Sequence, residues 1–77
     1  MITDEKIDAF FKGKPLKYKT NSGKIVIAKI KKDSLFDSIF YLTIRDEEGK
    51  KLSKYELRKN LVWNFANYIF ENNFYVQ

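Results

Sequence analysis

The longest helical pattern in this chain runs from residue 53 to residue 72: Ser53-Lys-Tyr-Glu-Leu-Arg-Lys-Asn-Leu-Val-Trp-Asn-Phe-Ala-Asn-Tyr-Ile-Phe-Glu-Asn72. It opens with a capping box, because the Ser53 hydroxyl can accept from the backbone N–H three residues later and the Glu56 carboxylate can accept from the N–H of Ser53. An Asn pair, Asn72-Asn73, is typical of a helix end in the left-handed conformation. The segment therefore predicts a long C-terminal helix.

The apolar residues of this segment share one side of the helix at 100° per residue. The predicted inner stripe consists of Leu57, Leu61, Phe65 and Tyr68, widened by Tyr55, Val62, Ala66 and Ile69. Trp63 and Phe70 fall at the border of this stripe, beside the polar side. The tail Phe74-Tyr-Val-Gln77 is apolar, so we expect it to dock against a sheet edge or the helix.

The remainder of the chain predicts a short helix followed by three strands. Residues 3–12 carry a helical apolar stripe that ends at Gly13 and Pro15. From residue 16 apolar and polar residues alternate, and the turn signal at residues 21–23 joins two such runs into a hairpin that ends at residue 32. A third alternating run covers residues 38–45. We expect one α+β domain over residues 1–77, with a three-stranded antiparallel meander and both helices on one face (α-β-β-β-α).

Composition narrows the classes of function. The chain has 77 residues with no Cys and no His, so it offers no disulfide framework, thiol nucleophile or imidazole base. Its acidic residues cluster in turns and match no metal-binding spacing, and its three glycines are isolated. We therefore expect a non-catalytic protein with no metal and no cofactor. No apolar run approaches the ~18 residues of a membrane span and the first residues are acidic, so we expect a cytoplasmic protein without a membrane partner.

The positive charge is unevenly distributed. The net charge is +5, and residues 12–32 contain eight Lys and no acidic residue. Residues 50–59 contain five basic residues and one acidic residue, whereas residues 33–48 are mainly acidic. A small domain with this asymmetry suits a polyanion such as DNA or RNA, or an acidic protein surface; a solvated lysine-rich face is the alternative.

Strand periodicity places basic and aromatic residues together on the sheet face that the helices leave open. The predicted nucleic-acid contacts on this face are Lys17, Lys19, Lys29, Lys31, Tyr41 and Arg45. Lysine and arginine bind phosphates, and a tyrosine can stack on a base or hydrogen-bond a phosphate. The second predicted anchor is Lys51, Lys54 and Arg58, which surround the expected helix start, where free N–H groups favour anions. Solubility and protection of strand edges also explain exposed Lys.

A protein-interaction module is the alternative function, and it uses other residues. Its candidate anchors are Leu35, Phe36, Trp63, Phe70, Phe74 and Tyr75. Large exposed aromatic residues dominate the energetics of interfaces. Leu35 and Phe36 lie in a connection that should be polar, so they either fold back over the core edge or form an exposed contact. The aromatic residues also suit a core or a homodimer interface.

The expected element order resembles, in outline, that of double-stranded-RNA-binding domains. In that family a lysine-rich start of the second helix is followed by an Ala-rich run, and the first hairpin loop contains Gly and His. Here the loop is Asn21-Ser22-Gly23 without His, and the helix carries Trp63, Phe65, Tyr68 and Phe70. The resemblance is therefore topological, and three-stranded sheets that enter a DNA groove fit the same outline.

Overall fold

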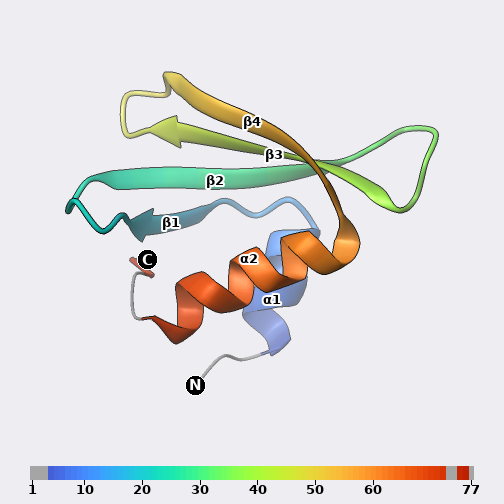
Figure 1. The fold of residues 1–77 in the computed structure, drawn as a ribbon, viewed down its shortest axis with the longest axis horizontal. Helices are drawn as coiled ribbons and strands as arrows, with labels where there is room; N and C mark the ends of the chain where they lie inside the picture. Colours follow the sequence, from blue (N-terminus) through green and yellow to red (C-terminus); the bar gives the residue numbers. More distant parts are fainter. Residues whose placement is uncertain (1–3, 73–74, 77) are drawn as a thin grey trace.

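The computed structural model describes residues 4–72 and 75–76. Its elements are α1 (Asp4–Phe11), β1 (Leu16–Lys19), β2 (Ile25–Lys32), β3 (Ile39–Asp46), β4 (Lys51–Arg58) and α2 (Lys59–Glu71) (Figure 1). The strands form one antiparallel sheet in the order β1-β2-β3-β4, so each strand pairs with the next along the chain. The predicted α+β class and meander are confirmed. The predicted number of strands is wrong, because the described residues form four.

The missing strand lies inside the segment that predicted the long helix. Residues 51–58 pair with β3, with Ser53 opposite Ile44 and Glu56 opposite Tyr41. The capping box therefore does not form, and α2 begins at Lys59, after Arg58 in an extended conformation. The same residues alternate with period two, since Tyr55 and Leu57 lie on one side and Lys54, Glu56 and Arg58 on the other. The sequence of residues 51–58 is compatible with both the helical period of 3.6 residues and the strand period of two residues. Pairing with β3 determines that these residues form a strand.

The fourth strand also removes the topological resemblance to double-stranded-RNA-binding domains. In that outline the second helix follows the third strand, whereas here β4 stands between them. At its far end α2 is capped by Asn72, whose φ of −95° is not left-handed; Asn73, the other residue of the predicted left-handed stop, lies outside the described residues. The side-chain amide of Asn72 donates to the carbonyl of Tyr68 at 2.8 Å.

Two hairpin loops of the same construction hold the sheet in register. Thr20 and Lys24 bracket the first, where the N–H of Thr20 donates to the carbonyl of Lys24 at 2.8 Å, and Asp46 and Lys50 bracket the second, where the equivalent distance is 2.9 Å. Each encloses three residues and places a glycine at positive φ, Gly23 at 86° and Gly49 at 91°. Three-residue hairpin loops commonly place glycine at this position. Asp46-Glu-Glu-Gly49 is therefore a hairpin loop that joins two strands.

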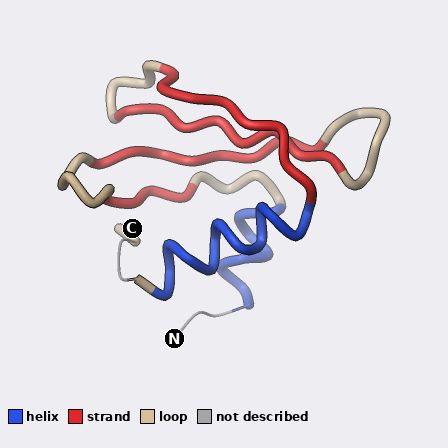
Figure 2. The backbone as a smooth tube through the Cα atoms, viewed as in Figure 1, coloured by secondary structure: helices blue, strands red, loops and turns tan. Residues whose placement is uncertain are grey.

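Both helices cover the same face of the sheet, as Figures 1 and 2 show. The core lies between them and the side chains that the strands direct towards them. Its buried residues, among those described, are Ile7, Phe10, Leu16, Tyr18, Val26, Ala28, Ile30, Phe40, Leu42, Val62, Ala66 and Ile69. The predicted inward positions on β2 and β3 are confirmed, with Ile44 half-buried against the core. We call the uncovered side of the sheet the outer face.

The buried stripe of α2 is rotated from the predicted one. Val62, Ala66 and Ile69 are buried and Phe65 is half-buried, but Leu61 and Tyr68, expected at the centre, are 47% and 53% exposed. The predicted stripe included residues 55 and 57, which belong to β4, and this displaced its centre. In the described part of the chain, neither helix combines the length and hydrophobicity that crossing a bilayer requires. The predicted start of the first helix at residue 3 lies outside the described residues.

Candidate nucleic-acid interface

The outer face carries all nine residues predicted to contact nucleic acid. They are Lys17 and Lys19 on β1, Lys29 and Lys31 on β2, Tyr41 and Arg45 on β3, and Lys51, Lys54 and Arg58 on β4. The two predicted clusters therefore form one surface, although most pairs of residues between them are 20 or more positions apart in the sequence. The second cluster does not surround a helix start as expected, because its residues belong to β4 and only Arg58 borders α2.

Strand register arranges these side chains in rows across the sheet. Lys17 lies opposite Ile27, which lies opposite Arg45, which lies opposite Lys51. In the next row Thr43 separates Lys29 from Lys54. In the third row Tyr41 separates Lys31 from Glu56. Because neighbouring strands lie about 4.8 Å apart, each row spaces its charges at about one or two strand widths.

The positive charge of this face is largely uncompensated. By register it holds eight cationic side chains and one carboxylate, Glu56. Among the described residues only Lys17 of these eight has a carboxylate oxygen within 4 Å, that of Glu47 at 3.8 Å. The other seven cationic residues are exposed. Arg45 donates from Nη1 to the carbonyl of Gly49 at 2.9 Å, which ties its guanidinium to the β3–β4 loop.

A hollow of about 310 Å³ opens at the β2–β3 end of this face. It is lined by Lys31, Lys32, Asp33, Ser34, Tyr41, Thr43 and Lys54. Three ammonium groups and the hydroxyls of Ser34 and Thr43 therefore border a space larger than a phosphate group. Ammonium and hydroxyl donors are the groups that proteins use to contact phosphate oxygens.

The one carboxylate in this hollow is already engaged. Oδ1 of Asp33 accepts from the Tyr41 hydroxyl at 2.7 Å, and Oδ2 accepts from the N–H groups of Leu35 at 2.8 Å and Phe36 at 2.9 Å. The Tyr41 hydrogen bond, followed by the two backbone bonds, holds the pKa of Asp33 below its usual range. The same bond raises the pKa of Tyr41. Asp33 therefore stays ionised while it braces the loop.

Tyr41 is placed to orient a neighbouring cation. Its ring is half-buried, and Nζ of Lys54 lies 5.2 Å from the ring centroid, within the range of a cation–π contact. Its hydroxyl proton is donated to Asp33. The expectation that Tyr41 stacks on a base or binds a phosphate remains a prediction, and the structure adds a second role in holding Lys54.

Sequence reasoning did not include Asp33 or Ser34 in the site. The signal was present, since Asp at the end of a strand commonly accepts from N–H groups two and three residues later. Asp33-Ser34-Leu35-Phe36 follows that pattern. The fixed loop places Ser34 beside the lysines.

The residues proposed for protein interaction lie in two separate places. Leu35 and Phe36 are at the tip of the β2–β3 loop and are 83% and 59% exposed, so they project from the fold. Trp63, on α2, is 49% exposed. Phe70 and Tyr75 are half-buried, and Phe74 lies outside the described residues.

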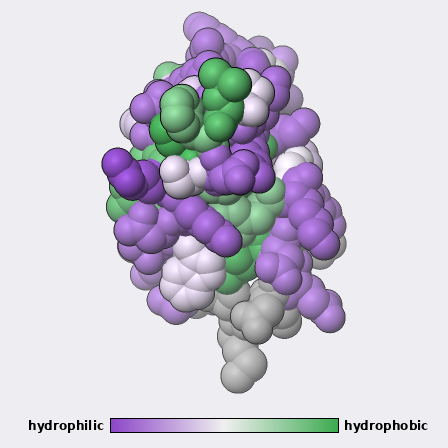
Figure 3. Space-filling view, turned by 90° about the vertical axis from the view of Figure 1, so that its right-hand side faces the viewer, coloured by the Kyte–Doolittle hydropathy of each residue, from purple (hydrophilic) through white to green (hydrophobic). Residues whose placement is uncertain are grey.

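Trp63 borders a groove of about 550 Å³ between the helices and the β2–β3 end of the sheet. Its lining is Ile7, Asp8, Phe11, Lys32, Asp37, Phe40, Lys59 and Trp63. Figure 3, which faces this end of the molecule, shows one hydrophobic area that protrudes near the top and another lower down between hydrophilic side chains. The apolar loop tip and this groove therefore share one end of the protein.

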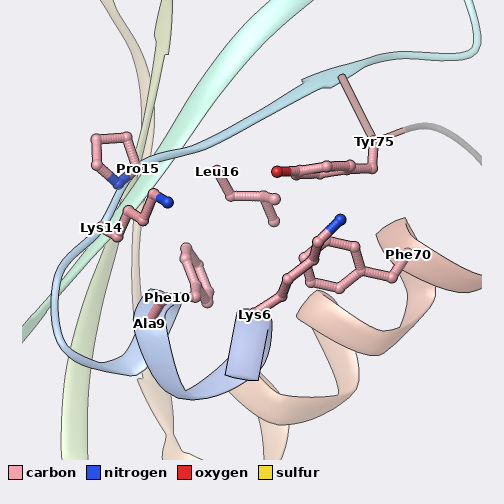
Figure 4. A pocket seen from close by; sticks show the side chains of 8 residues that line it. All are labelled: Lys6, Ala9, Phe10, Lys14, Pro15, Leu16, Phe70 and Tyr75. Atoms are coloured by element: carbon pink, nitrogen blue, oxygen red, sulfur yellow. The ribbon is translucent and has the colours of Figure 1, made fainter. Parts of the chain in front are cut away.

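Phe70 and Tyr75 instead close the opposite end of the core (Figure 4). Their ring centroids are 4.8 Å apart, and Nζ of Lys6 lies 4.4 Å from the Tyr75 centroid. Tyr75 forms a β-bridge with Tyr18, and the N–H of Val76 donates to the carbonyl of Lys17 at 2.8 Å. The tail was predicted to dock on a sheet edge or on the helix; its described residues, Tyr75 and Val76, dock on the β1 edge, and Tyr75 also contacts Phe70 of α2.

No group of three or more metal-binding side chains gathers within the residues that the structure describes. Comparisons with protein-family models, with curated proteins and with solved structures found no match to this chain.

Proposed function

We propose that this protein is a small non-catalytic binding module that contacts the phosphate backbone of a nucleic acid through its outer face. The observation that carries this proposal is that the strand residues of a single sheet face include eight cationic side chains and one carboxylate. Six of the eight cations are Lys and two are Arg. Lysine contacts phosphate as a point charge, so we expect affinity that depends strongly on salt and weakly on base sequence.

The hollow beside Tyr41 supplies the most defined phosphate position. Lys31 and Lys54 approach it from two strands that flank β3, and the hydroxyls of Ser34 and Thr43 add donors. Lys54 is held over the Tyr41 ring, which limits the freedom that it must lose on binding. We therefore place one backbone phosphate here and further phosphates along the rows towards Lys17 and Lys51.

The first experiment measures binding and its salt dependence. Fluorescence anisotropy is followed while the protein is titrated into labelled single- and double-stranded DNA and RNA at two salt concentrations. Binding through phosphates predicts an affinity that falls steeply with salt, because each phosphate contact releases condensed counterions. Absence of binding to all four nucleic acids at low salt would overturn the proposal, and binding insensitive to salt would contradict a phosphate mechanism.

A charge-matched pair of variants tests the surface itself. Lys29→Gln/Lys31→Gln removes two charges from the outer face, and Lys12→Gln/Lys14→Gln removes two exposed charges from the α1–β1 connection. Both variants have the same net charge. We expect the first to reduce the slope of log affinity against log salt by about 2 and the second to leave it nearly unchanged. Equal losses in both variants would show that net charge, and not this face, drives binding.

The groove beside Trp63 supports a second candidate function, a protein-interaction module. The exposed tip at Leu35 and Phe36 and the half-exposed Trp63 lie at one end of the molecule, and Trp63 lines a groove there whose other walls combine apolar residues with two Lys and two Asp. This candidate predicts a protein partner that is captured by the wild-type chain and lost with Trp63→Ala. Leu61→Ala is the matched control, since Leu61 is similarly exposed on α2 but does not line the groove.

A further inference from the structure

The outer edge of β4 is the open edge of this sheet. At the opposite side, Tyr75 bridges Tyr18 and Val76 donates to Lys17, so the tail pairs with part of the β1 edge. β4 is the last strand of the sheet, and no other described segment pairs with its outer side. It has eight residues, twice the length of β1. A long edge strand presents a row of unpaired N–H and C=O groups to any strand of matching pattern.

Apolar side chains accompany this edge. Leu52 and Tyr55 of β4 are 43% and 49% exposed, although the sheet face to which Tyr55 belongs is the one that the helices cover elsewhere. Figure 1 shows the reason, because β4 begins far from both helices and bends towards them only near its junction with α2. Backbone groups and apolar surface are therefore available side by side.

We infer that β4 pairs antiparallel with β4 of a second copy of this chain across a two-fold axis centred on Tyr55. An axis perpendicular to the sheet keeps the inner and outer faces of both copies on the same sides. The pairing must then be centred on a residue, so that it opposes its own counterpart. This requirement leaves few registers to compare.

Charge distinguishes the three registers centred on Lys54, Tyr55 and Glu56. Centring on Lys54 opposes the two Lys54 side chains, and centring on Glu56 opposes the two Glu56 side chains and brings Lys54 opposite Arg58. Centring on Tyr55 places Lys54 of each copy opposite Glu56 of the other, which gives two opposite-charge pairs on the outer face. Opposite charges directly across an antiparallel pair stabilise it, whereas like charges destabilise it.

The registers centred on Leu57 and Ser53 would include residues that are not in regular β-strand pairing. A centre at Leu57 would pair β4 with the first turn of α2, which begins at Lys59. A centre at Ser53 would draw in the irregularity where β4 departs from regular pairing with β3, between the partners of Ile44 and Arg45. The Tyr55 register uses residues 53–57, which pair regularly with β3. It also brings the two Tyr55 rings into a cross-strand pair on the inner face.

Lysine on an edge strand usually deters association. Here the charge of Lys54 disfavours pairing with strands that lack an acidic residue at the matching position. A second copy of this chain supplies Glu56 opposite each Lys54. The edge therefore favours its own sequence over others. A dimer formed in this way joins two four-stranded sheets into one of eight strands, with both outer faces on the same side.

Cysteine cross-linking tests this register in a chain that has no cysteine of its own. Tyr55→Cys would place two thiols about 5 Å apart across the axis. Lys51→Cys, also exposed and on β4, would place them about 27 Å apart, eight residues along the pair. With a short bis-maleimide linker and no nucleic acid present, we expect covalent dimers from Tyr55→Cys and not from Lys51→Cys. Equal yields from the two variants would overturn the assigned register.

Charge reversal provides an independent readout by sedimentation equilibrium. Glu56→Lys opposes like charges twice in each dimer, and we expect it to raise the dimer dissociation constant about tenfold or more. The double variant Lys54→Glu/Glu56→Lys restores opposite charges and should recover dimerisation, while circular dichroism confirms that each variant is folded. A wild-type chain that stays monomeric at high micromolar concentration, or a double variant as weak as Glu56→Lys, would refute the inference. Neither result bears on nucleic-acid binding by the monomer.

Discussion

Asp33 connects the outer face to the β2–β3 loop through a single carboxylate. It accepts the Tyr41 hydroxyl with one oxygen and two backbone N–H groups with the other. Tyr41 in turn lies beneath the ammonium group of Lys54. A residue outside the predicted binding set therefore positions two members of that set, and it also determines how Leu35 and Phe36 project.

The lowered pKa of Asp33 gives a stability effect with a defined sign. Because its pKa in the folded state lies below the unfolded value of about 3.9, its contribution is fully present above that pH and is lost as the pH falls through the folded-state pKa. As the pH falls through this acidic range, we expect the free energy of unfolding to decrease less in Asp33→Asn than in the wild type. Urea unfolding at each pH measures both decreases. An equal decrease in the free energy of unfolding of the two proteins would contradict this role of the ionised Asp33 carboxylate.

Gly49 lies in the loop that leads from the third strand to the fourth. It adopts φ 91° in the loop between β3 and β4, and a Cβ at this position would meet no atom within 4 Å. The cost of a side chain there is therefore that of the backbone conformation alone. Other L-amino acids disfavour this region of φ.

Substitution of Gly49 tests whether residues 46–50 form a hairpin loop or an irregular segment that precedes a helix. We expect Gly49→Ala to lower the free energy of unfolding by about 1–2 kcal/mol, because alanine is strained at positive φ. Gly49→Asn is the matched variant and should cost less, since Asn tolerates left-handed backbone. Thermal or urea unfolding measures both. A stabilising effect of Gly49→Ala would indicate that the loop does not hold this conformation.

At the scale of elements, α2 shows how a small change in helix boundary changes the packed side. The predicted stripe began at residue 55, and the observed helix begins at Lys59. Val62, Ala66 and Ile69 then face the sheet, while Leu61 lies at the flank with about half of its surface exposed. Both stripes are apolar, so hydrophobicity alone does not choose between them.

Two truncations on α2 separate these stripes. Ile69→Ala should lower the free energy of unfolding by about 2–5 kcal/mol, because it leaves a cavity at a buried position. Leu61→Ala should cost less than about 1 kcal/mol, since exposed substitutions have small effects. Chemical denaturation of both variants tests the difference. Similar losses would show that Leu61 is packed.

At the scale of the whole molecule, the two faces of the sheet differ in composition and in what covers them. The inner face holds the core and both helices, whereas the outer face concentrates positive charge on a thin body with extents of 36 × 30 × 16 Å. Like charges at strand-to-strand spacing repel one another in the folded state. Ion pairs offset little of this repulsion, since Lys17–Glu47 is the one pair among the described residues that involves the face.

This repulsion predicts that salt stabilises the fold. Raising the ionic strength from about 0.01 M to 0.15 M shortens the Debye length from about 30 Å to about 8 Å, which screens the cations of the outer face from one another. We therefore expect the melting temperature to rise with NaCl over this range. The variant Lys29→Gln/Lys31→Gln should show a smaller rise, and a melting temperature that fell with salt would mean that attractive ion pairs dominate.

The sequence by itself determined the elements whose signals were local and unambiguous. In β1, β2 and β3 apolar or aromatic residues recur at every second position along one side, and together with a three-residue loop ending at Gly23 this pattern predicted the first hairpin and the inward side chains. Alternation also predicted correctly that Lys17, Lys19, Lys29, Lys31, Tyr41 and Arg45 lie on the outer face. The apolar tail predicted its own docking, because exposing such a segment to water is unfavourable.

Tertiary structure decided the use of residues 51–58, whose pattern satisfies both a helix and a strand. Pairing with β3 gave these backbone groups partners and placed Lys51, Lys54 and Arg58 on the outer face, where the helix assignment would have separated them from the other lysines. The sequence thus determined which residues are cationic, and strand pairing determined that they form one surface. Their proximity depends on hydrogen bonds between segments distant in the chain, which local periodicity does not encode.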